Sequence, residues 1–470
     1  MQCASLWLAT FHIRRKHCHL FHERRPVGIT CETKRYSRVP PEQKSSARAL
    51  LGCNAVSGRH AGVSWQFAAI ALLASLAAGC ASTSRKVAPP LLDGEATPPG
   101  FPSSVRIVND TRRAFEARAP QILAQVHAAA GNGPINILAL SGGGVGAAFG
   151  AGAVVGWTRM GDRPEFQIVT GVSAGALIAP FAFLGVGWDE QLVDIFSGAR
   201  TRFLLQPHWM SALFRSSVYR GKPLFDLVDH YVTADVLTAV AQESAKGRLL
   251  LVATTDLDKE QTVIWNLGVI AAQGGEFARR LFRDVIVASA SIPGLFPPVI
   301  IRVAQSGALY DEMHVDGGTT AALFIAPEIA SLLPVGSDLL DGANVYIIVN
   351  GQFGARTETT PMKTIPILKR SVTASLQSGS LAAVEIALSL AQRNGMRLRV
   401  SEIPNDYPYL GPLDVQPSGM RALFEYGVRC AREGQLWATP MGLLDRVELA
   451  RRAPVGMEPE CPGPAPMRTD

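Results

Sequence analysis

Short apolar runs alternate with longer helix-like stretches through the middle of the chain. The strand-like runs occupy residues 135–140, 166–170, 249–253 and 345–349. The helix-like stretches occupy residues 148–157, 174–184, 367–395 and 417–434. Because this alternation is typical of a sheet covered by helices, it predicts an α/β fold with a mostly parallel central sheet and helices on both faces.

A separate apolar run, Val63–Ala78, lies nearer the N-terminus. It is too short to span a bilayer comfortably, but it has the length of the hydrophobic region of a signal peptide. The sequence L-A-A-G-C-A-S over Leu76–Ser82 resembles a lipobox, in which small residues fit the signal peptidase and the cysteine becomes the lipidated N-terminus. We therefore predict a lipoprotein signal peptide over residues 56–79 and lipidation of Cys80. A buried apolar helix that ends in Gly-Cys is the alternative.

Composition sets the other boundaries. Residues 1–55 have no hydrophobic periodicity and precede the signal peptide, so we expect a non-folded extension or a start site assigned too early. Residues 80–104 are rich in Pro, Ser and Gly, as in a flexible linker. Residues 105–440 then form one folded domain, and residues 453–470 are expected to be a disordered tail.

The charge of the chain is unevenly distributed. The formal net charge is +6, but the first 60 residues hold eleven Lys and Arg against three Glu, which leaves the other residues slightly acidic. A nucleic-acid site needs a basic excess on the folded domain, so we expect no nucleic-acid partner. The seven cysteines show neither a disulfide framework nor zinc-ligand spacing, and we expect no metal.

The pentapeptide Gly171-Val172-Ser173-Ala174-Gly175 matches G-x-S-x-G between a predicted strand and a predicted helix. In this context the motif is a nucleophile elbow, because Gly171 and Gly175 permit the tight turn that exposes the hydroxyl of Ser173. The pentapeptide alone is equally compatible with an ordinary loop.

A glycine run follows the strand-like residues 135–140. Acyl transfer needs backbone N–H groups close to the developing oxyanion, and Gly142, Gly143 and Gly144 let the backbone approach a substrate carbonyl. The alternative is a loose dinucleotide-binding loop that extends to Gly150, with Asp162 as the acid for the ribose.

The third element is a general base for the serine. In the hydrolase order Ser…Asp…His the histidine comes last, but the histidines after Ser173 are His208, His230 and His314, and none follows the D-G-G motif that begins at Asp316. A triad would have to use one of these three. A Ser-Asp dyad needs none of them, because a buried carboxylate can itself accept the serine proton. An Asp-Gly hairpin turn is the other interpretation of Asp316.

Together these motifs resemble the patatin-like phospholipase family, in which a glycine-rich oxyanion loop, G-x-S-x-G and D-G-G or D-G-A follow in this order. Two further stretches resemble bacterial members, namely Ala288–Pro298 and the predicted strand pair of Ala253–Asp258 with Val263–Trp265. The resemblance spans about residues 135–324. It implies a three-layer fold with neither metal nor organic cofactor.

The resemblance also implies site residues. Ser173 would be the nucleophile, Asp316 the base, and the amides of Gly143 and Gly144 the oxyanion donors. Many members carry Arg or Lys two residues after the third glycine, then Gly, but those positions here hold Gly146 and Ala147. This departure leaves open whether phospholipid or neutral ester is preferred.

We therefore expect a lipid acyl hydrolase, a phospholipase A or carboxylester hydrolase, that acts on a lipid or acyl-ester substrate through an acyl-enzyme. Because Ala81 rather than Asp follows Cys80, we expect an outer-membrane lipoprotein that faces the periplasm of a bacterial envelope. The alternative is a catalytically silent envelope lipoprotein that uses the same fold to bind lipid or protein, with a soluble dinucleotide-binding protein as a third. The sequence does not indicate an oligomeric state.

Overall fold

The structure, a computed structural model, describes residues 85–87, 96–108, 112–197, 217, 219–324, 340–354, 359–439 and 459–464, and of residues 112–119 the backbone alone. The chain divides into two compact units, Met1–Leu73 and Ala74–Asp470. The first unit lies outside the described residues, and so do the predicted extension, the signal peptide and Cys80. All that follows concerns the second unit.

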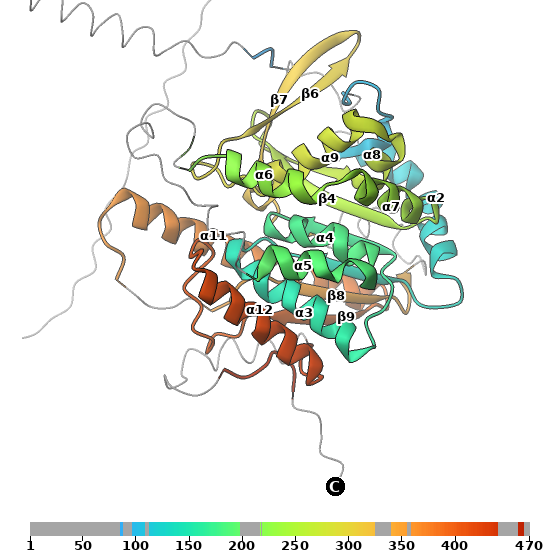
Figure 1. Ribbon diagram of the computed structural model, residues 1–470. Coiled ribbons are helices and arrows are strands. Elements are labelled where there is room, and N and C mark those ends of the chain that lie inside the picture. Colours follow the sequence, from blue (N-terminus) through green and yellow to red (C-terminus); the bar gives the residue numbers. More distant parts are fainter. Residues whose placement is uncertain are drawn as a thin grey trace, which may run out of the picture. The chain divides into compact units, whose positions relative to one another are not determined.

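A nine-stranded sheet forms the centre of this unit (Figure 1). Its strands are β1 Arg106–Val108, β2 Asn136–Leu140, β3 Ile168–Val172, β4 Leu249–Asp256, β5 Gln261–Asn266, β6 Val299–Gln305, β7 Ala308–Asp316, β8 Asn344–Val349 and β9 Arg397–Glu402. The order is β1-β5-β4-β3-β2-β8-β9, and the β6–β7 hairpin joins β4 through β7. The pairs from β4 to β9 along this order are parallel, whereas β1, β5, β6 and β7 add antiparallel pairs.

Helices cover both faces of the sheet. They are α2 Arg112–Ala130, α3 Ala147–Met160, α4 Ala174–Leu184, α5 Asp189–Phe196, α6 Lys222–Tyr231, α7 Ala234–Ala245, α8 Leu267–Gln273, α9 Gly275–Ser289, α11 Thr364–Arg393 and α12 Pro417–Arg432. Apolar residues of α2 and of the second half of α11 pack on one face, and those of the other helices pack on the opposite face. The predicted α/β fold, with a largely parallel core and helices on both faces, is confirmed.

Strand β2 shows why the sheet is covered on both sides. Leu138 and Leu140 point into the core beneath α3 and α4, whereas Ile137 and Ala139 point into the core beneath α2 and α11. All four side chains are buried. A central parallel strand therefore has an almost continuous apolar sequence rather than an alternating one.

Helix α12 packs unusually closely against α3. A Cβ atom at Gly152 of α3 would lie 2.0 Å from the carbonyl oxygen of Phe424 on α12, so this contact requires glycine. The buried residues of α12 include Met420, Leu423 and Phe424, at helical spacing. The contact fixes α12 beside α3 and α5 (Figure 1).

Helix α11 is long and apolar enough, by length and composition alone, to cross a membrane. Val384 and Ala387 are nevertheless buried against the sheet. This packing places the helix in the outer layer of the domain.

The N-terminal segment differs from the flexible linker expected over residues 80–104. Ala96 and Phe101 are buried, and Thr97 forms an antiparallel bridge with Ala304 of β6. Farther upstream, Arg85 forms an ion pair with Asp258, with 2.8 Å between Nη1 and Oδ2. Composition favoured a linker because Pro and Gly are common there, but two apolar side chains and one ion pair attach the segment to the domain.

The C-terminal segment also differs from expectation. Cys461 forms a disulfide with Cys430 of α12, although the sequence showed no disulfide framework. The amide of Glu460 donates to Asp406 Oδ2 at 2.9 Å, and the amide of Gly463 donates to a backbone carbonyl at 2.6 Å. Residues 459–464 are therefore packed where a disordered tail was expected, and the rest of that predicted tail lies outside the described residues.

Candidate active site

Strand β4 brings the two predicted catalytic residues together. Its first part, Leu249–Ala253, pairs with β3, which ends at Val172 opposite Ala253. Its last part pairs along the same edge with β7, in which Asp316 lies opposite Thr254. Two strands thus meet end to end along one edge of β4, and the residue that follows β3, Ser173, meets the last residue of β7.

Ser173 occupies a strained turn between β3 and α4. Its φ of 54° is positive, which is unusual for a residue other than glycine, and it is buried. The turn is possible because its neighbours are glycines. A Cβ atom at Gly175 would lie 2.5 Å from the carbonyl oxygen of Leu140, and one at Gly171 would lie 2.8 Å from that of Gly175. The geometry is that of a nucleophile elbow.

The hydroxyl of Ser173 donates a hydrogen bond to Asp316, with 2.6 Å between Oγ and Oδ2. The other carboxylate oxygen, Oδ1, accepts the amide N–H of Gly318 at 2.7 Å. The amide of Asp316 donates to the carbonyl of Ser291 at 2.9 Å, and the carbonyl of Asp316 accepts the hydroxyl of Thr255 at 3.0 Å. Both sides of the carboxylate and its backbone are therefore held in place.

Burial raises the pKa of Asp316 to about 7, although its hydrogen bonds with Ser173 and Gly318 favour the charged form. Loss of water around a carboxylate penalises the anion, and here this effect outweighs the two hydrogen bonds. A base whose pKa lies near neutrality can take a proton from a hydroxyl and later return it.

Ser289, at the end of α9, holds the turn at Ser173 through two hydrogen bonds. Its hydroxyl accepts the amide N–H of Ser173 at 2.9 Å and donates to the carbonyl of Ala253 at 2.7 Å. It therefore links the turn after β3 to β4. The sequence singled out the stretch Ala288–Pro298 only as part of a family resemblance, which contained Ser289 without indicating its contacts.

The glycine run lies beside Ser173. A Cβ atom at Gly142 would lie 3.1 Å from the Cβ of Ser173, a tight contact that glycine avoids where the loop approaches the serine. The amide of Gly142 already donates to the carbonyl of Ala322 at 3.1 Å. Within the part of the chain that the structure describes, the amides of Gly143 and Gly144 have no such acceptor. Of the three predicted oxyanion donors, these two are free to bind a ligand.

Asn350 and Tyr409 brace this loop, and the sequence analysis identified neither. The amide of Asn350 donates to the Oγ of Ser141 at 2.8 Å, and its side-chain Nδ2 donates to the carbonyl of Ser141 at 2.6 Å. The hydroxyl of Tyr409 donates to the carbonyl of Gly143 at 3.1 Å. The position of Asn350 directly after a parallel strand was a usable signal, because ligand sites gather at the carboxyl ends of such strands.

The same contacts explain why position 146 holds glycine where many members of the family carry Arg or Lys. A Cβ atom there would lie 2.1 Å from the carbonyl oxygen of Asn350 and 2.8 Å from the hydroxyl of Tyr409. No side chain fits at this position. The lack of Arg or Lys is therefore a consequence of how closely β8 and the loop that carries Tyr409 approach the glycine run.

The alternative sites from the sequence find less support. Asp162 is exposed after the end of α3, about 20 Å of helix away from the glycine run that begins it, so it cannot complete a dinucleotide loop. Among the described residues, no group of three or more His, Cys, Asp and Glu is placed to hold a metal ion.

The histidines that the structure describes after Ser173 make other contacts. The Nδ1 of His314 lies 3.0 Å from the hydroxyl of Thr254, and its Nε2 lies 3.4 Å from Glu312. The ring of His230 packs edge-on against Tyr231. His208 lies outside the described residues. In the described structure, the hydrogen-bond partner of the Ser173 hydroxyl is Asp316.

A narrow apolar cavity of about 70 Å³ opens at Ser173. The residues that line it come from α4, α5, α6, α12 and the adjoining loops, and they include Leu177, Phe196, Leu224, Phe296, Leu413 and Met420. Leu376 of α11 lies over the other side of the site, where its Cδ2 would be 3.2 Å from a Cβ atom at Gly318. The reactive oxygen thus faces an apolar environment, which suits a hydrocarbon chain.

Comparison with known proteins gives this geometry a family context. Residues 138–329 match the family model described as patatin-like phospholipase. The patatin-like region contains both Ser173 and Asp316, together with the glycine run. The chain has no match among curated proteins. Among solved structures, the crystal structure of VipD from Legionella pneumophila is similar at 13% identity and a TM-score of 0.30, over 67% of each chain. That similarity is too low to bear on the site.

The buried state of Asp316 gives a stability prediction. A carboxyl whose pKa is about 7 when folded, against an ordinary 3.8, stabilises the fold fully below that ordinary value and loses this contribution as pH rises through 7. Asp316→Asn cannot ionise. We expect the Tm of the variant, relative to the wild type, to rise between pH 5 and pH 8. An equal Tm difference at both pH values, measured by calorimetry, would contradict the assignment.

Proposed function

We propose that this chain is a lipid acyl hydrolase that acts through a dyad of Ser173 and Asp316. The supporting observation is the 2.6 Å contact between Ser173 Oγ and Asp316 Oδ2 at the mouth of an apolar cavity. The match of residues 138–329 to the patatin-like phospholipase family supports ester hydrolysis of lipids.

The reaction begins with proton transfer. As Ser173 Oγ attacks the ester carbonyl, its proton moves to Asp316 Oδ2, and the carbonyl oxygen becomes an oxyanion. The amides of Gly143 and Gly144 stabilise this oxyanion. When the tetrahedral intermediate collapses, Asp316 returns the proton to the departing alcohol, which leaves the acyl group on Ser173. Water then attacks the acyl-enzyme by the same route, and fatty acid is released.

The apolar lining of the cavity supports the acyl chain as the part of the substrate that binds inside it. Its lining offers few polar atoms, so the headgroup side of the substrate has to lie toward the glycine run and solvent. No cation stands at Gly146 to bind a phosphate there. A carboxylester without a charged headgroup therefore fits this site as well as a phospholipid does.

Removal of either dyad member tests the mechanism. Ser173→Ala should abolish turnover of a soluble short-chain ester, because no acyl-enzyme can form. Asp316→Asn should lower kcat/KM by about 10²–10⁴-fold, because the amide cannot accept the serine proton. In the wild type, kcat/KM should rise with pH and level off above an apparent pKa of about 7.

Histidine variants provide the control for this experiment. His208→Ala, His230→Ala and His314→Gln should retain activity when circular dichroism shows that they are folded. If one of them is inactive while Asp316→Asn keeps near-normal activity, the dyad is wrong. If wild-type protein hydrolyses no ester and a fluorophosphonate probe does not label Ser173, the silent binding protein is the better account.

The cavity predicts how activity depends on acyl length. Leu177 lines the cavity one helical turn after Ser173, so Leu177→Trp should block a hexanoyl chain but admit an acetyl group. We expect the ratio of kcat/KM for p-nitrophenyl hexanoate over acetate to fall at least about tenfold. Leu184→Trp, on the same helix but outside the cavity lining, is the matched control. Equal losses for both esters in Leu177→Trp would show that acyl chains bind elsewhere.

We also propose that Cys80 is lipidated and that the domain lies in the periplasm at the outer membrane. The disulfide between Cys430 and Cys461 supports an oxidising compartment. Arg85 lies five residues after Cys80 and forms an ion pair with Asp258 of the domain. The anchor could then extend at most about 18 Å from this attachment, so the domain would stay close to the lipid surface.

Cys80→Ser tests the anchor. The variant should lose membrane partitioning or accumulate as the unprocessed precursor, whereas wild-type protein should fractionate with membranes. Mass spectrometry of the mature wild-type protein is decisive, because an unmodified peptide that spans Gly79-Cys80 would rule out both processing and lipidation.

A further inference from the structure

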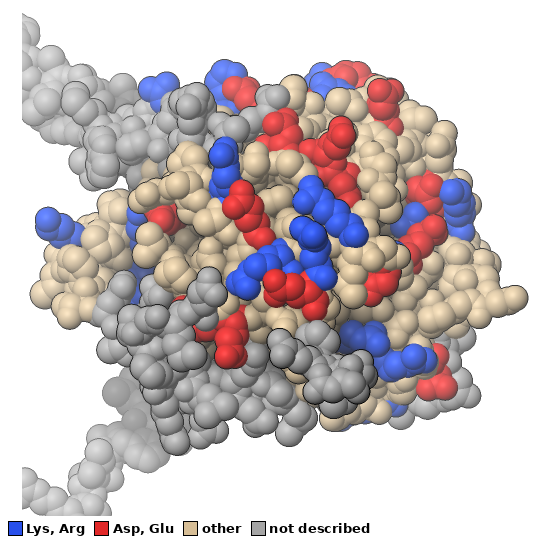
Figure 2. All heavy atoms as spheres, turned by 60° about the horizontal axis from the view of Figure 1, so that its bottom comes forward, with Lys and Arg blue, Asp and Glu red and all other residues tan. Residues whose placement is uncertain are grey.

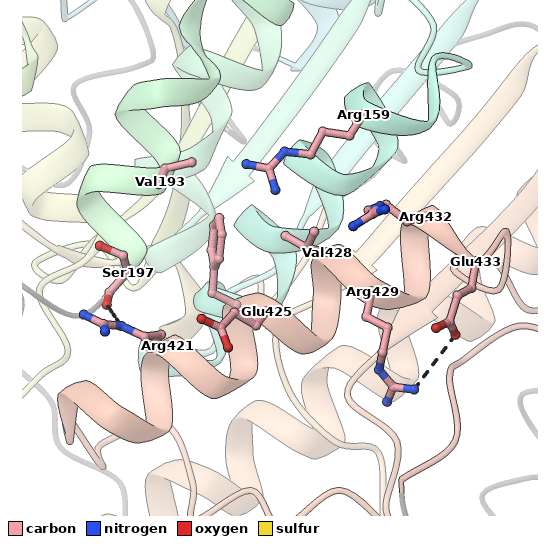
Figure 3. A pocket seen from close by; sticks show the side chains of 10 residues that line it. Arg159, Val193, Ser197, Arg421, Glu425, Val428, Arg429, Arg432 and Glu433 are labelled. Atoms are coloured by element: carbon pink, nitrogen blue, oxygen red, sulfur yellow. Dashed lines mark hydrogen bonds and ion pairs between the residues drawn. The ribbon is translucent and has the colours of Figure 1, made fainter.

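A second hollow, of about 720 Å³, lies between α3, α5 and α12. It shares no lining residue with the cavity at Ser173. Its apolar lining residues are Val193, Phe424 and Val428, and around them lie four arginines and two glutamates, Arg159, Arg421, Arg429, Arg432, Glu425 and Glu433 (Figure 3). The lining therefore has an excess of positive charge.

The four arginines differ in whether they have hydrogen-bond or ion-pair partners. Arg429 lies 3.9 Å from Glu433, and Arg421 donates to the carbonyl of Ser197 at 3.4 Å. Arg159 and Arg432 have neither a hydrogen-bond acceptor nor an acidic partner among the residues that the structure describes. Figure 3 shows their side chains extending from α3 and α12 over the apolar residues between the two helices. Two guanidinium groups thus line the same hollow without a bonded carboxylate, although Glu425 and Glu433 also line it.

The sequence of α12 produces this arrangement. Met420, Phe424 and Val428 recur at every fourth position and pack inward, whereas Arg421, Glu425 and Arg429 recur one position later and lie exposed. The face of the molecule toward which α12 is turned shows Lys and Arg side chains gathered near its middle, next to acidic ones (Figure 2). The close packing of α3 on α12 then adds Arg159 to this stripe.

Helix termini explain only part of this pattern. Arg159 lies in the last turn of α3, and Arg432 lies in the last turn of α12, where a cation interacts favourably with the helix dipole. Arg393 provides the same interaction in the last turn of α11 but lines no such hollow. The helix dipole favours a cation in the last turn of each helix. It does not require two such cations to line the same hollow.

We propose that this hollow binds a phosphate group, carried either by a soluble phosphomonoester or by an anionic lipid headgroup. Guanidinium groups bind phosphate oxygens through paired, charge-assisted hydrogen bonds, which Arg159 of α3 and Arg432 of α12 can supply. Arg421 adds positive charge at the rim, while Val193, which is only partly buried, offers contact to the apolar part of the ligand. The volume is that of a small-molecule site.

Binding to the full chain that carries Ser173→Ala tests this proposal, because that variant cannot turn over a lipid probe. Calorimetric titrations with inorganic phosphate and with dihexanoyl phosphatidic acid cover the soluble and the lipid forms of the ligand. We expect Arg159→Gln and Arg432→Gln each to weaken binding about tenfold, the loss of one charged hydrogen-bonding partner. Arg393→Gln, the matched helix-end control, should bind as the parent does.

Two outcomes would overturn the proposal. One is the absence of binding of either probe at millimolar concentration. The other is equal weakening by Arg393→Gln, which would mean that general surface charge attracts the anion. A second set of Arg159→Gln and Arg432→Gln variants keeps the native Ser173. These variants should still hydrolyse ester, which shows that they are folded.

Vesicles separate the two sources of phosphate. If inorganic phosphate binds and phosphatidylcholine vesicles with phosphatidic acid recruit no more protein than vesicles without it, the ligand is soluble. If phosphatidic acid recruits the protein and this recruitment is lost in the double variant, the ligand is a lipid headgroup. In both cases Arg159 and Arg432 are the residues that bind it.

Discussion

The shared edge of β4 is the constraint on which the candidate active site depends. β3 pairs with the first part of this edge and β7 with the last part, so that Val172 and Asp316 lie opposite consecutive residues, Ala253 and Thr254. The separation of Ser173 from Asp316 is therefore fixed by backbone hydrogen bonds in three strands. A shift of β7 by one residue would turn the side chain of Asp316 to the other face of the sheet and away from the hydroxyl.

The same burial that fixes the dyad also sets its chemistry. The carboxyl group of Asp316 is cut off from water, which raises its pKa, and the hydrogen bonds from Ser173 and Gly318 offset only part of this effect. The domain thus loses stability by burying this charge near neutral pH. The result is a buried carboxyl group, hydrogen-bonded to the hydroxyl of Ser173, whose pKa lies near neutrality.

Close backbone packing shapes the rest of the site. The carbonyl of Asn350 approaches Gly146 so closely that no side chain fits, and Tyr409 holds the carbonyl of Gly143. Helix α3 follows this glycine run. Near its other end, close contact with α12 brings Arg159 toward Arg432. Close contacts at Gly146, just before α3, and at Gly152, within α3, therefore fix the positions of the glycine run and of the second, basic hollow.

Local patterns in the sequence determined the α/β fold, the elbow at Ser173, the glycine run and the candidate base, because each depends on neighbouring residues or on the period of one strand or helix. Only the tertiary structure decided that the amide of Gly142 is engaged with Ala322, that Ser289 and Asn350 support the loops, and that Cys430 pairs with Cys461. These contacts join residues 31 to 209 positions apart. Strand register and helix packing create such contacts, and no local pattern of polar and apolar residues encodes them.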